Sequence, residues 1–261
     1  MSAYGAITVA NETVNLLPPT TWDLPQPAPG KPATPFRRLV LHHLRLDSAR
    51  ALPSGPSLLD YTHGIFAAEI EAGRTYPQET DALVDDSDAR GHGSSSAIST
   101  HTYTRAAFEA YFWAADVIVA IGQKDDHDAG LVRDGDVQAR AQVGSRSGDL
   151  RAGLAGSSLE DALVGFYYVK PNYPGRSSHV STTYYLHTFH HFTPTTRQKK
   201  KQICNAGFII PPAHREFGYG TILGKSYLHY GPALGYKASV FNLVYANNTG
   251  SLRYVCAPAT V

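Results

Sequence analysis

The chain has 261 residues, a formal net charge of +1 and 17% charged residues, a length that suits one large domain or two small ones with a buried core. The near-zero charge argues against nucleic acid and anionic membranes as partners, because both attract a basic surplus. No apolar run approaches the ~18 residues of a membrane-spanning helix, and the first residues lack the pattern of a secretory signal, so we expect a soluble cytoplasmic protein.

The first part of the chain is rich in proline. Residues 1–36 contain seven prolines. Because proline fixes φ and lacks an N–H, we predict an extended N-terminal arm here, with a short strand near Ala6–Val9. Residues 36–46 (FRRLVLHHLRL) then alternate loosely between apolar and polar positions, which predicts a strand at the start of the folded domain.

Apolar residues at helical spacing follow. They predict a helix over 57–72, with Gly73 where a C-terminal cap belongs, and a second helix over 105–114 that leads into an apolar strand at 115–122. Polar segments rich in Gly and Ser have few groups to bury. Such connections are expected at 80–102 and 123–158.

The second half has clearer strand patterns. Runs of aromatic and β-branched residues predict strands at 162–172, 203–210 and 236–248. Two prolines end the second of these strands, and a glycine-containing turn then opens a helix that runs to Gly231 or Gly235. The order of strand, glycine loop, helix and strand is the most informative feature of the sequence.

The glycine loop reads Arg215-Glu216-Phe217-Gly218-Tyr219-Gly220. The first N–H groups of a helix lack partners within the helix, and the helix dipole favours an anion there. Gly218 and Gly220 let the backbone approach a phosphate, and Arg215 adds a charged donor. The R-x-x-G-x-G spacing matches neither the Walker loop nor the dinucleotide fingerprint. Alone, it fits an ordinary strand-to-helix turn about as well as a phosphate site.

Several separated segments resemble a known family. In this order, the segments EIEAGRTYPQ (69–78), VGFYYVKPNYPGRSSH (164–179), CNAGFIIPPAHR (204–215) and LGYKASVFNLVYANNTGS (234–251) look like the fungal MPR-type acetyltransferases. The loop itself resembles the acyl-CoA loop of the GNAT superfamily of N-acetyltransferases, to which that type is assigned. The resemblance covers most of 57–179 and 203–253.

The resemblance implies an α/β (mixed α+β) domain over 37–253 with a GNAT-like acyl-CoA N-acyltransferase fold, in which helices flank a central mixed, mostly antiparallel sheet. It implies an N-acetyltransferase that uses acetyl-CoA as its co-substrate and no metal. The amine of a small molecule, such as azetidine-2-carboxylate or a proline-related metabolite, would attack the thioester directly. Proximity and removal of a proton from the amine would then account for most of the catalysis.

The resemblance also implies a binding mode for acetyl-CoA. The pantetheine arm would lie between 206–210 and 240–245, and a main-chain N–H of Ile209 or Ile210 would polarise the thioester carbonyl. The pyrophosphate would rest on main-chain N–H groups at the start of the helix, supported by Arg215. The expected cofactor-binding residues are Ile209, Ile210, Arg215, Glu216, Phe217, Gly218, Tyr219, Gly220 and Thr221.

Three asparagines match positions that hold the substrate in this family. An amide can accept a hydrogen bond from the attacking amine and donate one to a carboxylate without adding a charge. We expect Asn205 to be the catalytic residue that positions the nucleophile, and Asn242 and Asn248 to bind the substrate with it. The alternative is structural, because Asn248 lies in a sequence that fits a turn and a strand asparagine can be satisfied within the fold.

Other candidate residues favour structural roles. His187, His190 and His191 lie close together, but no neighbouring Asp, Glu or Cys completes a ligand set, so we expect no metal site. Cys204 lies in an apolar strand and fits a buried thiol better than a nucleophile. Glu69, with Glu71 beside it, could serve as a general base, but we favour a solvated helix face.

Two stretches depart from the family. Residues 180–202 replace what should be a short connection between strands, and we interpret them as an insertion, with translated intron sequence as the hypothesis for its origin. The basic run 197–201 within it leaves a nuclear signal open. The resemblance implies a further helix and strands beyond Val261, so we expect a C-terminally incomplete fold with a divergent tail at 254–261.

These departures leave other functions open. A chain that lacks part of the sheet could be an acyl-CoA-binding remnant without activity. A protein N-acetyltransferase is less favoured, because nothing in the sequence marks a peptide groove. We expect a small-molecule amine as the partner rather than nucleic acid or a membrane, and the resemblance suggests a homodimer. The expected location is the cytoplasm, and the basic run leaves the nucleus open as a second one.

Overall fold

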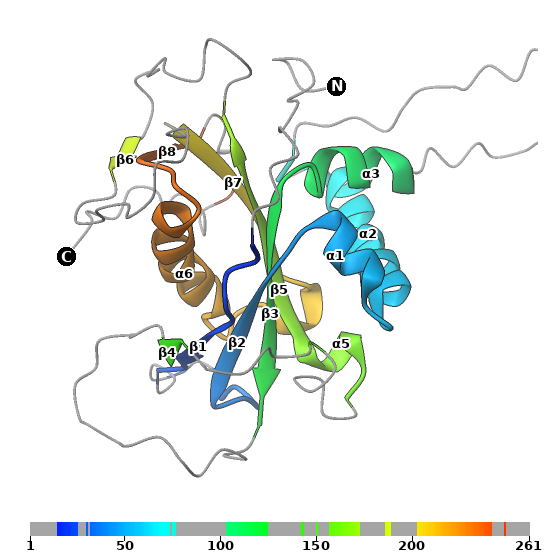
Figure 1. Ribbon diagram of the computed structural model, residues 1–261. Helices are drawn as coiled ribbons and strands as arrows, with labels where there is room; N and C mark the ends of the chain where they lie inside the picture. Colours follow the sequence, from blue (N-terminus) through cyan, green and yellow to red (C-terminus); the bar gives the residue numbers. More distant parts are fainter. Residues whose placement is uncertain are drawn as a thin grey trace, which may run out of the picture.

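An eight-stranded sheet with helices on both faces forms the core of the protein (Figure 1). The computed structural model describes residues 15–25, 30, 32–73, 75–76, 103–124, 142–143, 150, 157–172, 186–188, 203–241 and 248. The strand order is β4–β1–β2–β3–β5–β7–β8–β6. The mixed α/β architecture expected from the sequence is therefore confirmed, and it is consistent with a GNAT-like fold.

Most neighbouring strands run antiparallel. The strands are β1 (Thr20–Asp23), β2 (Arg38–Leu44), β3 (Asp116–Gln123), β4 (Gln142–Val143), β5 (Leu163–Pro171), β6 (Leu186–Thr188), β7 (Ile203–Ile209) and β8 (Ala238–Val240). Only β7 and β8 pair in parallel among the described strands. The sheet is thus mixed and mostly antiparallel, as predicted.

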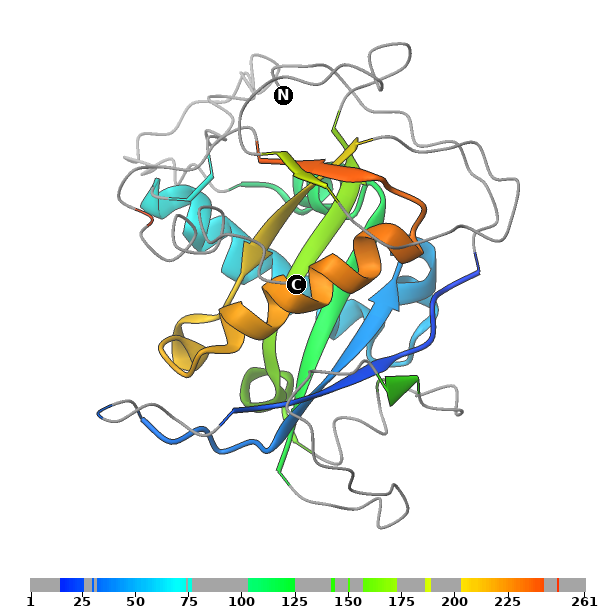
Figure 2. The same cartoon turned by 90° about the vertical axis from the view of Figure 1, so that its left-hand side faces the viewer.

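The helices divide between the two faces of the sheet. They are α1 (Leu46–Ala51), α2 (Gly55–Ala72), α3 (Arg105–Phe112), α5 (Leu159–Ala162), the 3₁₀ turn η2 (Pro212–His214) and α6 (Tyr219–Ala233). Helices α1, α2 and α3 lie on one side, and α6 crosses the other side diagonally (Figures 1 and 2). Among the described helices, none combines the length and apolar character that a membrane crossing needs.

The predicted elements correspond closely to the observed ones where the structure describes them. The strands expected at 36–46, 115–122, 162–172 and 203–210 are confirmed as β2, β3, β5 and β7. The helix expected at 57–72 is α2, and Gly73 caps it with φ at 62°. Of the long strand expected at 236–248, β8 forms its beginning, while 242–247 lie outside the described residues, as does Ala6–Val9.

Two strands lie in segments that we did not assign to the folded domain. β1 belongs to the proline-rich arm, yet it pairs with β2 and buries Trp22. β6 belongs to 180–202, and its backbone pairs with β8. The sheet therefore extends beyond the boundaries predicted from the sequence. The interpretation of 180–202 as an insertion stays a prediction, and 254–261 lie outside the described residues.

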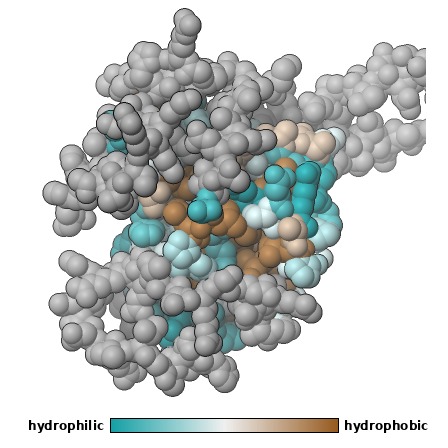
Figure 3. All heavy atoms as spheres, in the orientation of Figure 1, coloured by the Kyte–Doolittle hydropathy of each residue, from teal (hydrophilic) through white to brown (hydrophobic). Residues whose placement is uncertain are grey.

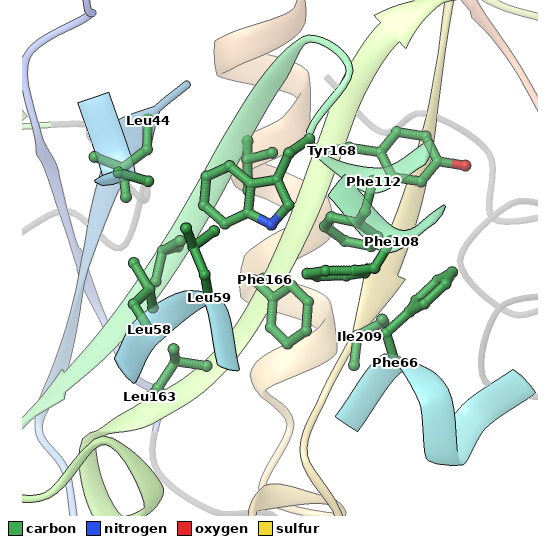
Figure 4. Close-up of a cluster of buried hydrophobic side chains, with 14 of the residues drawn as sticks. Leu44, Leu58, Leu59, Phe66, Phe108, Phe112, Leu163, Phe166, Tyr168 and Ile209 are labelled. Carbon is green, nitrogen blue, oxygen red and sulfur yellow. The ribbon is translucent and has the colours of Figure 1, made fainter. Parts of the chain in front are cut away.

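An aromatic cluster fills the space between the sheet and α1–α3. Phe66 of α2 is fully buried at its centre, with ring centroids of neighbouring aromatic residues 5.0–5.8 Å away. Figure 4 shows these side chains pointing toward one another from α2, α3, β5 and β7. In the orientation of Figure 3, hydrophobic surface shows near the centre of the described face, beside hydrophilic residues on the helical side.

A second cluster lies between the sheet and α6. Its members include Tyr167, Leu223 and Tyr227. Gly165 allows the close approach of α6, because a Cβ there would lie 2.7 Å from Leu223 Cδ1. The strand pairing skips Val164, since Ile121 pairs with Leu163 and Ala120 with Gly165. This bulge shifts the alternation of β5.

Replacing Phe66 with Ala should lower the free energy of unfolding by about 3–5 kcal/mol, because it removes a ring packed on all sides and leaves a cavity. Leu228→Ala is a suitable control, since Leu228 on α6 is 42% exposed and surface substitutions usually change stability by less than about 0.5 kcal/mol. Urea denaturation of both variants measures the difference, and equal losses would contradict a core centred on Phe66.

Candidate functional site

The parallel pair of β7 and β8 opens after two residues. Ile203 pairs with Ala238 and Cys204 with Ser239, and beyond them β7 continues without β8 as a partner. On its other side β7 stays paired with β5 as far as Ile209. Figure 2 shows β8 turning away from β7. One edge of β7 is therefore left without a strand partner among the described residues, from Asn205 onward.

The direction of each main-chain group on β7 follows from the pairing with β5. Asn172 donates its N–H to the carbonyl of Ile203 at 3.1 Å, so Ile203 faces β5. Successive residues of a strand present their N–H and C=O groups to opposite edges. Asn205, Gly207 and Ile209 therefore face β5 as well. Ala206 and Phe208 present their main chains to the open edge.

Tyr227 of α6 holds the junction of the two strands. Its hydroxyl lies 3.1 Å from Cys204 Sγ and donates a hydrogen bond to Ser239 Oγ. Beyond the junction, the ring of Phe208 packs 5.7 Å from Tyr227 and 6.5 Å from Phe241, between centroids. Cys204 is a fully buried free thiol. These contacts agree with the structural role that its apolar surroundings predict.

The start of α6 lies beyond the end of β7. Gly218 is the N-cap residue with φ at 85°, a left-handed conformation that favours glycine. No side chain caps this end, and the first turn contains no acidic residue. Thr221 donates its N–H to the carbonyl of Gly218 at 3.0 Å, so its N–H already has an acceptor. The N–H groups of Tyr219 and Gly220 are the ones that an anion could reach.

Arg215 is held in place by two acceptors. Its Nη2 forms an ion pair with Glu69 of α2, and its Nε donates to the carbonyl of Ile210 at 3.1 Å. Glu69 also accepts a hydrogen bond from Thr75 at 3.0 Å. Glu69 therefore connects α2 to the loop. The expectation that it lies on a solvated helix face is wrong, because its carboxylate is engaged by Arg215 and Thr75, and the same contacts argue against a general base. Glu216 next to Arg215 has φ at 72°, unusual for a residue other than glycine.

Asn205 occupies the position expected for a substrate-binding residue. It is half-buried at the start of the open edge, and its Nδ2 donates to Asn172 Oδ1 at 2.8 Å. Its Oδ1 is buried and has no hydrogen-bond partner within the described part of the chain. A buried acceptor without a partner is costly in a finished core. Asn205 Oδ1 is thus available to a ligand.

The other two asparagines are less well placed by the structure. Asn242 follows β8 but lies outside the described residues. Asn248 is half-buried. Their predicted roles in binding the substrate stay predictions, as do the roles of the loop residues toward acetyl-CoA.

A cluster of polar aromatic residues beside Asn205 was missed in the sequence. Gly207 faces the rings of Tyr76 and Tyr168, and a Cβ there would lie 2.7 Å from Tyr76 Oη. The hydroxyl of Tyr76 is buried and has no partner within the described residues. Tyr168 Oη lies 3.0 Å from Tyr111 Oη. These tyrosines come from three distant segments, so no local pattern could have grouped them.

Lys170 completes this cluster, and it is only 7% exposed. Its Nζ lies 3.5 Å from the ring centroid of Tyr111 and 4.1 Å from that of Tyr168, and donates to the carbonyl of Tyr111 at 3.2 Å. Lys170 is also the register partner of Asn205. Directly opposite residues share a face of the sheet, with Cβ atoms about 5 Å apart.

Burial changes the pKa of several groups in this cluster. Desolvation lowers the pKa of Lys170 to about 7. The two rings favour the charged amine, but no carboxylate among the described residues forms an ion pair with it, and desolvation prevails. Burial also raises the pKa of the Tyr76 and Tyr168 phenols well above their usual range. At neutral pH the tyrosines keep their protons, whereas Lys170 can exchange its own.

The histidine and carboxylate contacts elsewhere in the described fold are structural. His43 accepts an N–H from Leu17 at 2.9 Å and lies 3.0 Å from Asp116, which also binds Arg45. Burial alone would raise the pKa of Asp116, but the hydrogen bonds from His43 and Arg45 outweigh it and hold that pKa below its ordinary value. No set of three or more His, Cys, Asp or Glu among the described residues is arranged to hold a metal ion.

The arrangement of the strands and the glycine loop is that of a class of acyl-CoA-binding sites. Antiparallel strands lead into a parallel pair that opens toward a glycine loop at a helix start, an arrangement consistent with the acyl-CoA sites of GNAT-type enzymes. No family model matches the chain. Over 102 residues the chain is 40% identical to N-acetyltransferase aca1 of Schizosaccharomyces pombe, a match that covers 38% of each protein. The similarity supports a GNAT-type N-acetyltransferase, although it spans less than half of that relative.

Replacing Lys170 with Met should stabilise the protein most below pH 7. Below pH 7 the folded wild type must bury the charged amine of Lys170, whereas in the unfolded chain this amine is hydrated. The buried charge therefore lowers the free energy of unfolding. Because burial lowers the pKa of Lys170 from 10.5 to about 7, the unfolded state binds more protons between these values. The stability of the wild type therefore rises with pH in this window, by at most about 1.4 kcal/mol per pH unit from this group.

The advantage of the Met variant should shrink as the pH rises from 7 toward 10.5, and urea denaturation at pH 6, 8 and 9.5 measures it. Lys225→Met on the exposed side of α6 is the matched control and should show a difference that is independent of pH. A constant difference between wild type and Lys170→Met would contradict a lowered pKa at Lys170.

Proposed function

We propose that the protein is an acetyl-CoA-dependent N-acetyltransferase that acetylates the amine of a small molecule, such as azetidine-2-carboxylate or a proline-related metabolite. The observation that carries this proposal is the opening between β7 and β8, which leads from Asn205 toward the uncapped start of α6. The name of the fission-yeast relative supports acetyl transfer in general. The choice of substrate comes from the resemblance in sequence.

In this proposal acetyl-CoA lies along the open edge of β7, with its pyrophosphate at the start of α6 and its thioester farther back along the strand. The pyrophosphate is bound by the N–H groups of Tyr219 and Gly220, where the helix dipole favours an anion. The pantetheine arm runs back along β7, whose extended backbone covers about 3.3 Å per residue. The thioester then lies on the open edge at Phe208, between the start of α6 and Asn205. The start of a helix alone is weak support for a pyrophosphate site. The open edge of β7, which leads to the start of α6, is a second observation in favour of acetyl-CoA.

The thioester carbonyl requires a donor that faces the opening. Ile209 directs its N–H toward β5, because it is in register with Phe166 in the same alternation as Asn205 and Gly207. We therefore propose the N–H of Phe208 as the donor instead of that of Ile209. A donor aimed at the position of the developing oxyanion stabilises the transition state more than the ground state.

The amine would approach on the face of β7 that carries Asn205. Asn205 Oδ1 has no partner among the described residues and can accept a hydrogen bond from the N–H of the amine. Tyr76 Oη offers a second polar contact. Holding the amine against the thioester supplies proximity. We further propose a cytoplasmic location, with the nucleus open as a second one, a homodimer, and no role for nucleic acid or a membrane.

Replacing Gly218 with Ala should weaken the binding of acetyl-CoA by about tenfold. An alanine at φ near 85° is strained by about 1–2 kcal/mol, and relief of this strain moves the N–H groups at the start of α6. Isothermal titration calorimetry with acetyl-CoA measures the affinity.

Gly235→Ala provides a matched control at the other end of the same helix. Gly235 has φ at 89°, and a Cβ at either glycine has open space around it. Both variants should lose similar stability, while only Gly218→Ala should lose affinity. Equal affinity in the two variants would argue against the start of α6 as the pyrophosphate site.

Replacing Asn205 with Ala should lower kcat/KM by about 10- to 100-fold, because the transition state loses a hydrogen bond worth about 1–3 kcal/mol. The assay follows release of the CoA thiol from acetyl-CoA with azetidine-2-carboxylate as acceptor. Asn15→Ala, at an exposed position far along the chain, is the control.

Each outcome of this assay has a distinct meaning. Equal activity in Asn205→Ala and wild type would exclude the proposed role of Asn205. Wild-type protein that folds and binds acetyl-CoA but releases no thiol with small amines would favour the acyl-CoA-binding remnant. Release with peptides alone would favour a protein N-acetyltransferase.

A further inference from the structure

Lys170 is a buried amine for which the described part of the fold supplies no anion. It contacts the rings of Tyr111 and Tyr168 and the carbonyl of Tyr111, all of them neutral groups. Buried lysines are normally paired. Within the described residues no carboxylate forms an ion pair with Lys170, so its charged form is poorly stabilised. An amine in such surroundings is suited to gaining and losing a proton.

The position of Lys170 places it beside the proposed reaction centre. It is in register with Asn205, in a pair whose main chains face each other, so the two side chains lie on the same face of the sheet. Asn205 is half-buried and Lys170 is buried. A nucleophile that binds Asn205 Oδ1 would therefore lie on the face of the sheet that carries Lys170, beside its register partner.

The reaction requires a base that removes a proton from the substrate amine, and the amide of Asn205 cannot serve as that base. A small secondary amine carries an extra proton in neutral water and must lose it before or during attack, while an amide does not accept a proton at this pH. Catalysis is best when the pKa of the base lies near the working pH. Tyr76 and Tyr168 stay protonated, and Glu69 is engaged by Arg215 and Thr75.

Charged groups on the neighbouring elements are directed elsewhere. On α3, Arg105 and Glu109 bind each other, and they also bind Asp60 and Arg50. On β3, Asp116 lies on the opposite face of the sheet from Val117 and binds His43 and Arg45 there. Among the described residues, the groups that face Lys170 are Tyr111 and Tyr168, with Tyr76 beside them.

We propose that Lys170 is the general base of the acetyl transfer and takes the proton from the substrate nitrogen that Asn205 orients. The inference rests on the proposed function and adds a residue to it. The substrate amine first loses its extra proton to solvent. Its nitrogen then forms a bond to the carbonyl carbon, the C–S bond breaks, and the remaining N–H proton moves to the neutral amine of Lys170. The resulting ammonium then gives a proton to the CoA thiolate, directly or through water, which restores neutral Lys170 and releases the free thiol.

A buried lysine could instead bind a carboxylate of the substrate, and two substitutions separate the roles. Lys170→Arg keeps a positive charge but cannot act as a base near neutral pH. Lys170→Met keeps the approximate length of the side chain and removes both properties. As a general base, Lys170 is needed as a neutral amine, so both variants should lower kcat by about 100-fold or more. KM and the affinity for acetyl-CoA should change little.

The dependence of kcat on pH gives a second readout. Wild-type kcat should rise with pH through about 7, the value at which Lys170 becomes neutral, and this rise should be lost in both variants. If Lys170→Arg keeps wild-type kcat while Lys170→Met raises KM, Lys170 binds a substrate anion and the proposal is overturned. Lys225→Met, on the exposed surface of α6, should match the wild type throughout.

A titration that needs no activity keeps the test decisive. In protein labelled with 13C at lysine Cε, the Lys170 resonance is identified by its absence from the spectrum of Lys170→Arg. Its titration midpoint should lie near 7, and a midpoint above 10 would overturn the proposal. Unchanged kcat in the Lys170 variants would refute the base alone. Wild-type protein that binds acetyl-CoA but acetylates no amine would refute the proposed function as well.

Discussion

The parting of β7 from β8 after two paired residues is the constraint on which the proposed site depends. Tyr227 joins the two strands at Cys204 and Ser239 through its hydroxyl, and the rings of Phe208 and Phe241 then pack on the α6 side of the sheet. Because the described parts of the two strands pair only at this junction, an edge of main-chain donors and acceptors on β7 has no strand partner among the described residues. Helix α6 connects the two strands, and its start therefore lies at the wide end of the opening.

The alternation of side chains along β7 gives its two faces different tasks. Cys204, Ala206 and Phe208 pack toward α6, while Asn205 and Gly207 face α2 and α3. The face toward α6 is apolar, so it anchors the helix. The other face has a glycine where two tyrosine rings approach, and the oxygen of its asparagine has no partner within the described part of the chain. A thioester bound at the edge would thus be reached by a nucleophile from the polar face alone.

Local patterns predicted the elements well and the site only in part. The apolar runs of β3 and β5 and the glycines around α2 and α6 are local signals, and each was confirmed. β1 was missed because its strand is short and lies among prolines, which ordinarily indicate extended chain. The glycine loop was singled out by its place between a strand and a helix, and Asn205 by a resemblance, and their roles in binding stay predictions. Tyr76 and Lys170 were not singled out, since their importance depends on burial and on partners from distant segments.

The cost of burying Lys170 connects the stability of the fold with its chemistry. A hydrophobic residue at this position of β5 would pack among Tyr111 and Tyr168 without losing hydration, and the same sheet would form. An amine here lowers stability at neutral pH, and the rings offset only part of that loss. Strain of this kind gathers at functional sites, where a group must stay reactive. Asn205 shows the same feature, since its oxygen has no partner among the described residues. The proposed substrate would bind at these two residues, which lie in register across β5 and β7.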